Sequence, residues 1–135
     1  MILENERKTL IGAERELLKS VQERGVLIGF LNHSDNHTRL YRQGVQPIVG
    51  AESVGAYLSK KTFTETWEPM KADVAQSADL GYTYGSYEMR EEISEATRPE
   101  KGYYARVWKR DAKGQWKVVF DVTSPLPPEV PKTKK

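Results

Sequence analysis

The order of hydrophobic patterns along the chain constrains its fold most strongly, because helical periodicity dominates the first part and strand-like segments follow. Leu10, Leu17 and Val21 recur at seven- and four-residue spacings, which place them on one apolar helical stripe. Gly25 follows this stripe and suits the end of a helix. We therefore predict helices over residues 3–22, 26–31 and 51–60.

The second part of the chain is rich in aromatic residues, with turn-forming residues between the apolar runs. Pro69 cannot donate a ladder hydrogen bond, so its strand is expected to bend or to lie at a sheet edge. Gly114 is expected to take the left-handed position of a bulged hairpin turn. We predict strands over residues 38–42, 64–74, 80–90, 102–110 and 116–124. Helices followed by a run of antiparallel strands indicate an α+β fold, in which the helices cover one face of a curved sheet.

The length of 135 residues is sufficient for one domain with its own hydrophobic core. We assign residues 1–127 to that domain and residues 128–135, which are rich in Pro and Lys, to a disordered tail. The sequence contains no Cys, which excludes disulfides, thiolate metal sites and thiol nucleophiles.

The charge pattern and hydropathy exclude two classes of partner. The formal net charge is only +2 and the one tight basic cluster lies at the C-terminal end, so we expect no nucleic-acid partner. No apolar run approaches the roughly 18–20 residues that span a bilayer, so we expect no membrane partner. The first residues lack the basic and apolar regions of a secretory signal, which favours a cytoplasmic protein. A secreted or periplasmic protein is the alternative if the given N-terminus is a trimmed one.

Short motifs stand out in the strand-rich part: Trp-Glu-Pro at 67–69, Ala-Asp-Val at 72–74, Asp-Leu-Gly-Tyr-Thr-Tyr-Gly at 79–85, Val-Trp-Lys-Arg at 107–110 and Gly-Gln-Trp-Lys-Val-Val-Phe-Asp at 114–121. Together they resemble the SnoaL-like, nuclear-transport-factor-2-like superfamily, in its branch of uncharacterised proteins, over about residues 4–127. The resemblance implies a cone-shaped curved antiparallel sheet, with the N-terminal helices packed on its concave face and a pocket enclosed between them. It also implies a homodimer. Relatives include ketosteroid isomerase, polyketide cyclases, scytalone dehydratase and members that only bind or oligomerise.

Asp121 is the candidate catalytic residue, because it interrupts an otherwise strongly strand-forming segment at residues 116–122. In related cyclases an acid on a late strand serves as general acid/base, and the resemblance implies that role here. A buried carboxyl group has a raised pKa and can transfer a proton near neutral pH. The alternative is a structural Asp, hydrogen-bonded near the end of the sheet or at a dimer contact.

The register of the last hairpin decides which residues surround Asp121. A three-residue bulged loop places Asp121 on the face of Ala105, whereas a four-residue loop places it on the face of Tyr104 and Arg106. In the second register Arg106 would neutralise Asp121 and lower its pKa, which argues against a general base. Both registers are consistent with the sequence.

The aromatic residues of the predicted strands can line an apolar pocket or form a packed core and dimer face. Asp35 is a further candidate, because relatives carry an acidic pair in the loop of residues 32–37 and this chain retains one acid there. We assign to the ligand pocket Trp67, Tyr84, Tyr104, Arg106, Trp108 and Asp35. His33 and His37 lie in the same loop without a complete ligand set, so we expect neither a metal nor a cofactor.

Three functions remain open. The leading hypothesis is a domain that binds a small hydrophobic or aromatic molecule in the cone pocket, because aromatic residues are plentiful and no complete catalytic set is present. The second is a cofactor-independent isomerase, cyclase or dehydratase that uses Asp121 and a tyrosine hydroxyl for proton transfer. The third is a dimeric protein-interaction module.

Overall fold

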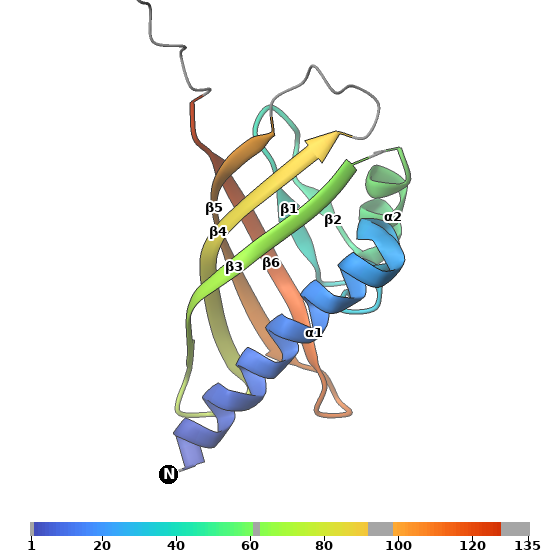
Figure 1. Cartoon of the computed structure of the whole chain (residues 1–135). Coiled ribbons are helices and arrows are strands. Elements are labelled where there is room, and N and C mark those ends of the chain that lie inside the picture. Colours follow the sequence, from blue (N-terminus) through green and yellow to red (C-terminus); the bar gives the residue numbers. More distant parts are fainter. Residues whose placement is uncertain (1, 61–62, 92–98, 128–135) are drawn as a thin grey trace, which may run out of the picture.

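A curved, open sheet of six strands has both helices on one of its faces (Figure 1). The computed structural model describes residues 2–60, 63–91 and 99–127. The elements in chain order are α1 (Ile2–Leu31), β1 (Arg39–Tyr41), β2 (Ile48–Val49), α2 (Ala51–Ser59), β3 (Phe63–Val74), β4 (Leu80–Glu91), β5 (Glu100–Arg110) and β6 (Trp116–Pro125). The expected tail at 128–135 lies outside the described residues.

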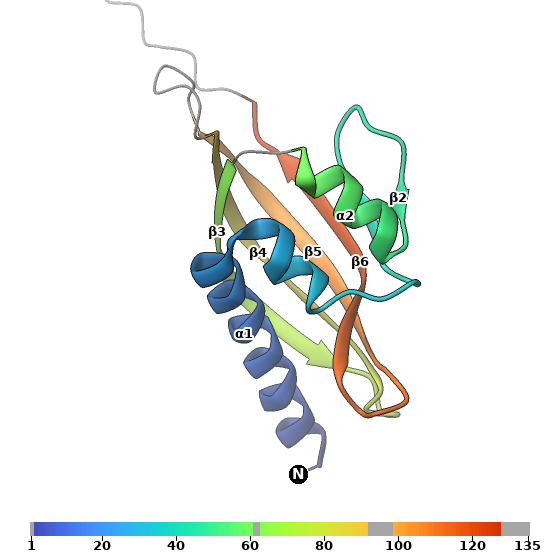
Figure 2. The ribbon, with the colours of Figure 1, turned by 90° about the vertical axis from the view of Figure 1, so that its right-hand side faces the viewer.

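The six strands form one sheet in the order β2-β1-β6-β5-β4-β3. The long strands β3 to β6 pair with one another in antiparallel fashion, as expected. In contrast, β1 runs parallel to β6, so the sheet is mixed and the expectation of a wholly antiparallel sheet is corrected at this pairing. A parallel pair cannot be joined by a hairpin, and here β2, α2 and the strands β3 to β5 lie between β1 and β6 in the chain. The α+β fold class, with both helices packed on the concave face, is confirmed (Figure 2).

Helix α1 is interrupted at Gly25, whose backbone angles (φ 88°, ψ 164°) lie outside the helical region. Glycine adopts a positive φ without the steric cost that a side chain would bring. The predicted helix end at Gly25 is therefore confirmed, and so is the short helical segment that follows it. Leu10 and Leu17 of the predicted stripe are fully buried, and α1 packs mainly on β3. No helix in the described part of the chain is both long and apolar enough to cross a membrane.

The edge strand β3 carries a bulge. Its ladder to β4 slips between Pro69 and Lys71, and Pro69 lies opposite Gly85. Because β3 pairs with β4 alone, the missing N–H of Pro69 removes no hydrogen bond from the interior of the sheet. The edge position predicted from Pro69 is confirmed.

The loop between β5 and β6 is a three-residue hairpin loop. The Asp111 N–H donates to the Gln115 carbonyl at 2.8 Å, and the Gly114 N–H donates to the Asp111 carbonyl at 2.9 Å. Gly114 has a φ of 80°, which confirms the left-handed position predicted for it.

A bulge in β6 sets the orientation of Asp121. Simple alternation from the three-residue loop would place Asp121 opposite Ala105. The ladder, however, slips by one residue at Val119, which has no partner in β5, and Asp121 pairs with Arg106. A slip of one residue exchanges the two faces of a strand, so Asp121 points into the cone.

The close approach of β3 to β4 requires glycine at position 85, because a Cβ atom there would lie 2.1 Å from the carbonyl oxygen of Glu68. We predict that Gly85→Ala lowers the free energy of unfolding by about 2–3 kcal/mol, as at other overpacked sites. Gly12→Ala is the control, because a Cβ atom at Gly12 meets no atom within 4 Å and alanine favours a helix over glycine by up to about 1 kcal/mol. Urea denaturation measures both changes, and an unchanged midpoint for Gly85→Ala would contradict this packing.

Candidate functional site

A buried ion-pair network built around Arg106 crosses the interior of the cone. From β5, Arg106 donates through Nε to Asp121 Oδ2 at 2.5 Å and through Nη1 to Glu14 Oε1 of α1 at 2.8 Å. The Tyr104 hydroxyl donates to the same Glu14 oxygen at 2.7 Å. Arg42, just beyond β1, lies 2.8 Å from Asp121 Oδ1. The network therefore connects the first helix with the central strands of the sheet.

Aromatic rings enclose the guanidinium group of Arg106. Its Cζ lies 4.4 Å from the ring centroid of Trp67, 4.3 Å from that of Tyr104 and 5.6 Å from that of Phe30. Cation–π contacts of this kind stabilise a desolvated cation by about 2 kcal/mol. Burial alone would lower the pKa of Arg106, but the neighbouring carboxylates more than reverse this effect and raise its pKa. Arg106 is therefore a permanent positive charge inside the cone.

The environment of Asp121 argues against the catalytic role assigned to it. Its side chain is fully buried, and burial alone would raise its pKa. The guanidinium groups of Arg42 and Arg106 more than reverse this effect, so the pKa of Asp121 lies below its ordinary value. A carboxylate held in its ionised form by two arginines is a poor proton acceptor near neutral pH.

Four of the residues assigned to the ligand pocket share the inner face of the sheet. Trp67, Tyr104, Arg106 and Trp108 are almost fully buried there and pack against one another and against the helices. The indole N–H of Trp108, for example, donates to the Thr83 hydroxyl at 3.0 Å. None of the four lines the cavity at the open end of the cone, and all four belong to the buried interior of the cone.

The other two residues assigned to the pocket lie elsewhere. Tyr84 is 40% exposed on the outer face of β4, where it stacks on Tyr82. It points outward because it alternates with the inward-facing Thr83. Asp35 lies in a turn outside the cavity, where its Oδ1 accepts a hydrogen bond from the backbone N–H of His37 at 2.8 Å.

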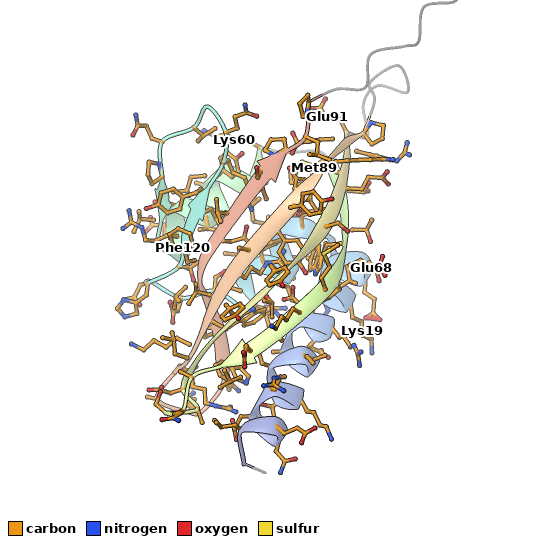
Figure 3. The ribbon with its side chains drawn as sticks, turned by 90° about the vertical axis from the view of Figure 1, so that its left-hand side faces the viewer. Lys19, Lys60, Glu68, Met89, Glu91 and Phe120 are labelled. Atoms are coloured by element: carbon orange, nitrogen blue, oxygen red, sulfur yellow. The ribbon has the colours of Figure 1, made fainter. Side chains whose placement is uncertain are left out.

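A cavity of about 210 Å³ lies inside the open end of the cone, where β3 and β5 begin and β4 and β6 end. Antiparallel pairing brings these ends together, since Glu65 pairs with Met89 and Met89 with Glu100. Figure 3 shows Met89 and Glu91 at this end of β4. The apolar side chains that line the cavity are Phe30, Leu58, Phe63, Met89 and Pro125. The polar and charged ones include Arg42, Tyr57, Glu65, Glu91, Glu100 and Thr123.

Glu65 is the most unusual group in the cavity wall. Its side chain points inward from β3, is only 6% exposed, and makes no hydrogen bond or ion pair with any other described residue. Burial raises its pKa to about 7, although Arg42 and Arg106 act in the opposite direction. Glu65 can therefore gain or lose a proton near neutral pH.

Three charged residues of the site, Glu14, Arg42 and Glu65, were not among those expected from the sequence. The position of Glu14 indicates a buried charge, because it lies three residues before Leu17 and so falls within the apolar stripe of α1. The position of Glu65 is a weaker indication of burial, because it lies two residues before Trp67 and shares its face of the strand. The position of Arg42 gives no such indication of burial, since it lies beyond the end of β1.

The two histidines have separate surroundings. His33 Nδ1 lies 3.2 Å from the Gly29 carbonyl, its ring packs edge-on against Trp108, and burial lowers its pKa. His37 is exposed. Over residues 2–60, 63–91 and 99–127, no group of three or more His, Asp or Glu side chains is arranged to hold a metal ion.

Several solved structures share this fold. A ketosteroid isomerase-like protein from Erwinia carotovora atroseptica matches with a TM-score of 0.77 and 17% identity, over 91% of this chain and 98% of that chain. A nuclear-transport-factor-2-like protein from Cytophaga hutchinsonii matches with a TM-score of 0.68 and 20% identity, over 89% and 98%. Another such protein, of unknown function, from Pseudomonas putida matches with a TM-score of 0.69 and 14% identity, over 87% and 84%.

These matches define the class of the fold. No family model and no curated protein matches the sequence. The chain has the cone fold of nuclear-transport-factor-2-like and ketosteroid isomerase-like proteins, as the sequence motifs implied. Identities of this level establish the fold and leave the activity to be argued from the site.

The raised pKa of Glu65 makes the stability of the empty protein depend on pH. The carboxyl group titrates near 4.5 when unfolded and near 7 when folded, so between these values the unfolded state gains charge first and stability is lost as the pH rises. We predict that Glu65→Gln raises the free energy of unfolding by about 3 kcal/mol at pH 8 and changes it little at pH 4.

Glu68→Gln is the matched control for this prediction, because Glu68 lies exposed on the opposite face of the same strand (Figure 3). Its substitution is expected to change the free energy of unfolding by less than about 0.5 kcal/mol at both pH values. Urea denaturation at pH 4 and pH 8 makes the comparison. A Glu65→Gln effect of equal size at the two pH values would show that the carboxyl group does not titrate near neutrality.

Proposed function

We propose that this protein binds a small molecule in the cavity beside Glu65. The observation that carries this proposal is a cavity at one end of the cone, where apolar side chains and polar or charged ones both line the wall and the carboxyl group of Glu65 is buried. Small-molecule sites are concave and combine apolar side chains with polar groups that fix the orientation of the ligand. The larger hollow, about 480 Å³, is a groove on the outer side of the sheet beside Glu68 and Tyr103, and none of the described residues that line it is a buried acid.

The size of the cavity favours a compact ligand. Sites for drug-sized molecules usually measure about 300–1,000 Å³, whereas an apolar cavity of about 150 Å³ is sufficient to hold benzene. The 210 Å³ of this cavity therefore suit one ring, or a short aliphatic chain, with a polar group attached. A four-ring molecule would extend out through the open end of the cone.

Proton-transfer catalysis is the second candidate function, and Glu65 favours it. A buried carboxyl group with a pKa of about 7 in a cavity wall is suited to general acid/base catalysis. An isomerase, cyclase or dehydratase built on this chain would use Glu65 in place of Asp121, which two arginines hold ionised. Turnover is separated from simple binding by incubating a bound compound with the protein and following the NMR spectrum of the compound.

Self-association through the outer face of the sheet is a further part of the proposal. Tyr82, Tyr84 and Tyr103 are 40–50% exposed on this face. Glu68 on one side of them and Lys109 on the other side supply charges of opposite sign. A two-fold contact brings each residue of a face opposite a different residue of the same face, so such a patch is able to complement itself.

A bulky side chain in the cavity provides the test of ligand binding. We predict that one-ring compounds raise the melting temperature of the wild type, because a ligand present at 100 times its dissociation constant stabilises the native state by about 2.7 kcal/mol. Met89→Trp is expected to abolish this rise by filling the cavity. Met70→Trp, at an exposed position of β3, is expected to retain it.

Thermal denaturation with panels of one-ring compounds and four-ring steroids makes this measurement, and circular dichroism confirms that both variants are folded. A rise in melting temperature that persists unchanged in Met89→Trp would place the ligand outside the cavity. Steroids that stabilise the protein when one-ring compounds do not would contradict the size argument.

The proposed dimer predicts a mass of twice the 15.4 kDa of the chain. We expect Tyr84→Glu combined with Tyr103→Glu to reduce this mass to that of one chain, because four like charges would then face one another across the contact. Ile28→Glu, at an exposed position of α1, is the control that retains the dimer. Size-exclusion chromatography with light scattering measures the mass, and a wild-type mass of a single chain would overturn the proposal.

A further inference from the structure

We propose that the ligand of the cavity is a cation: a compact amine whose apolar body packs inside the cavity and whose charge pairs with Glu65. This inference rests on the proposed binding function and adds the charge of the ligand to it. It is carried by the distribution of charge around the cavity.

The ion-pair network next to the cavity is already balanced. Arg106 contacts the carboxylates of Glu14 and Asp121, and Arg42 lies 2.8 Å from the carboxylate of Asp121. Arg42 also donates to the backbone carbonyls of Tyr41 and Asp121, at 3.1 and 3.2 Å. It is the one cationic side chain among the described residues that line the cavity. Its charge is therefore compensated before any ligand enters.

The carboxyl groups of the cavity wall lack such compensation. Glu65, Glu91 and Glu100 all line the cavity, and within the described residues none of them forms an ion pair with Lys or Arg. Glu100 accepts a hydrogen bond from the neutral Tyr87 hydroxyl at 2.6 Å. Once Glu65 is ionised, the cavity carries an excess of negative charge, which attracts a cation and repels an anion.

Glu65 supplies an independent indication of the charge of the ligand. It is an inward-facing carboxyl group, only 6% exposed, whose side chain makes no hydrogen bond or ion pair with another described residue, although Arg42 and Arg106 attract its ionised form. Buried charged groups are normally paired, and an unpaired carboxylate favours whatever ligand supplies the missing positive charge. The aromatic ring of Phe63 also lines the cavity, and aromatic faces attract cations.

Three one-ring probes of similar size and different charge test the inference: benzylamine, benzyl alcohol and benzoate. Each is titrated into the ¹⁵N-labelled chain at pH 8, and binding is followed by the amide chemical shifts. Benzylamine is expected to bind about tenfold more tightly than benzyl alcohol, the difference made by one charge-assisted contact, and benzoate is expected to bind most weakly.

Two glutamine variants assign the preference to one residue. Glu65→Gln is expected to weaken benzylamine binding about tenfold, to the level of benzyl alcohol, and to leave benzyl alcohol binding unchanged. Glu68→Gln, on the outer face of the same strand, is expected to leave the binding of all three probes unchanged.

The pH dependence gives a further readout. The charged groups that face Glu65 are Arg42, Arg106, Asp121 and Glu100, with Glu91 in the same cavity wall. The two arginines remain cations and Asp121 remains ionised between pH 6 and pH 8. Protonation of Glu65 at pH 6 is therefore expected to weaken benzylamine binding and to leave benzyl alcohol binding unchanged.

The outcomes separate this inference from the proposed function. If benzyl alcohol or benzoate binds in the cavity as tightly as benzylamine, the cation is excluded and small-molecule binding stands. If the benzylamine preference survives in Glu65→Gln, Glu65 is not the partner and the inference fails. If no probe binds, both proposals fail together. A preference for benzylamine that Glu65→Gln removes and Glu68→Gln retains supports both.

Discussion

The buried guanidinium group of Arg106 is the constraint on which the rest of the structure depends. It receives one carboxylate, Glu14, from the helical layer and another, Asp121, from the neighbouring strand. Buried ion pairs contribute little net stability, but loss of one partner costs about 3–5 kcal/mol because an unpaired charge is left inside. The helix must therefore lie on the sheet at the one position where Glu14 reaches Arg106. An apolar contact alone would allow the two layers to slide.

The sequence predicted the elements well and the register poorly. The end of the first helical segment at Gly25, the edge position of Pro69 and the turn at Gly114 follow from local backbone chemistry, which needs no knowledge of distant residues. The bulge at Val119 is different, because apolar residues occupy both sides of the strand there and the alternation that would reveal a slip is absent. The parallel pairing of β1 with β6 likewise depends on a contact between distant parts of the chain.

The register of the strands, which the sequence does not determine, also explains why the residues of the candidate site were only partly predicted. Which aromatic side chains face inward depends on register, so the composition of the strands could not separate the exposed Tyr84 from the buried Tyr104. Acidic residues at positions where the pattern requires apolar ones were the better signal. Glu14 and Glu65 both occupy such positions, and the structure places one in the ion-pair network and the other in the cavity wall. A charged residue at a position where the pattern predicts an apolar one therefore indicates a buried site better than an aromatic residue that fits the pattern.

Asp121 and Glu65 show how the arginines determine the chemistry of the cavity. Both acids are buried on the inner face of the sheet, and burial favours the neutral form of each. Asp121 lies within 2.8 Å of two guanidinium groups, so its pKa falls below the ordinary value and its charge is permanent. Glu65 has no ion pair with any described residue, so burial prevails and its pKa rises to about 7. Because Arg106 and the rings around it fill the interior, the group that can still respond to a ligand lies at the open end.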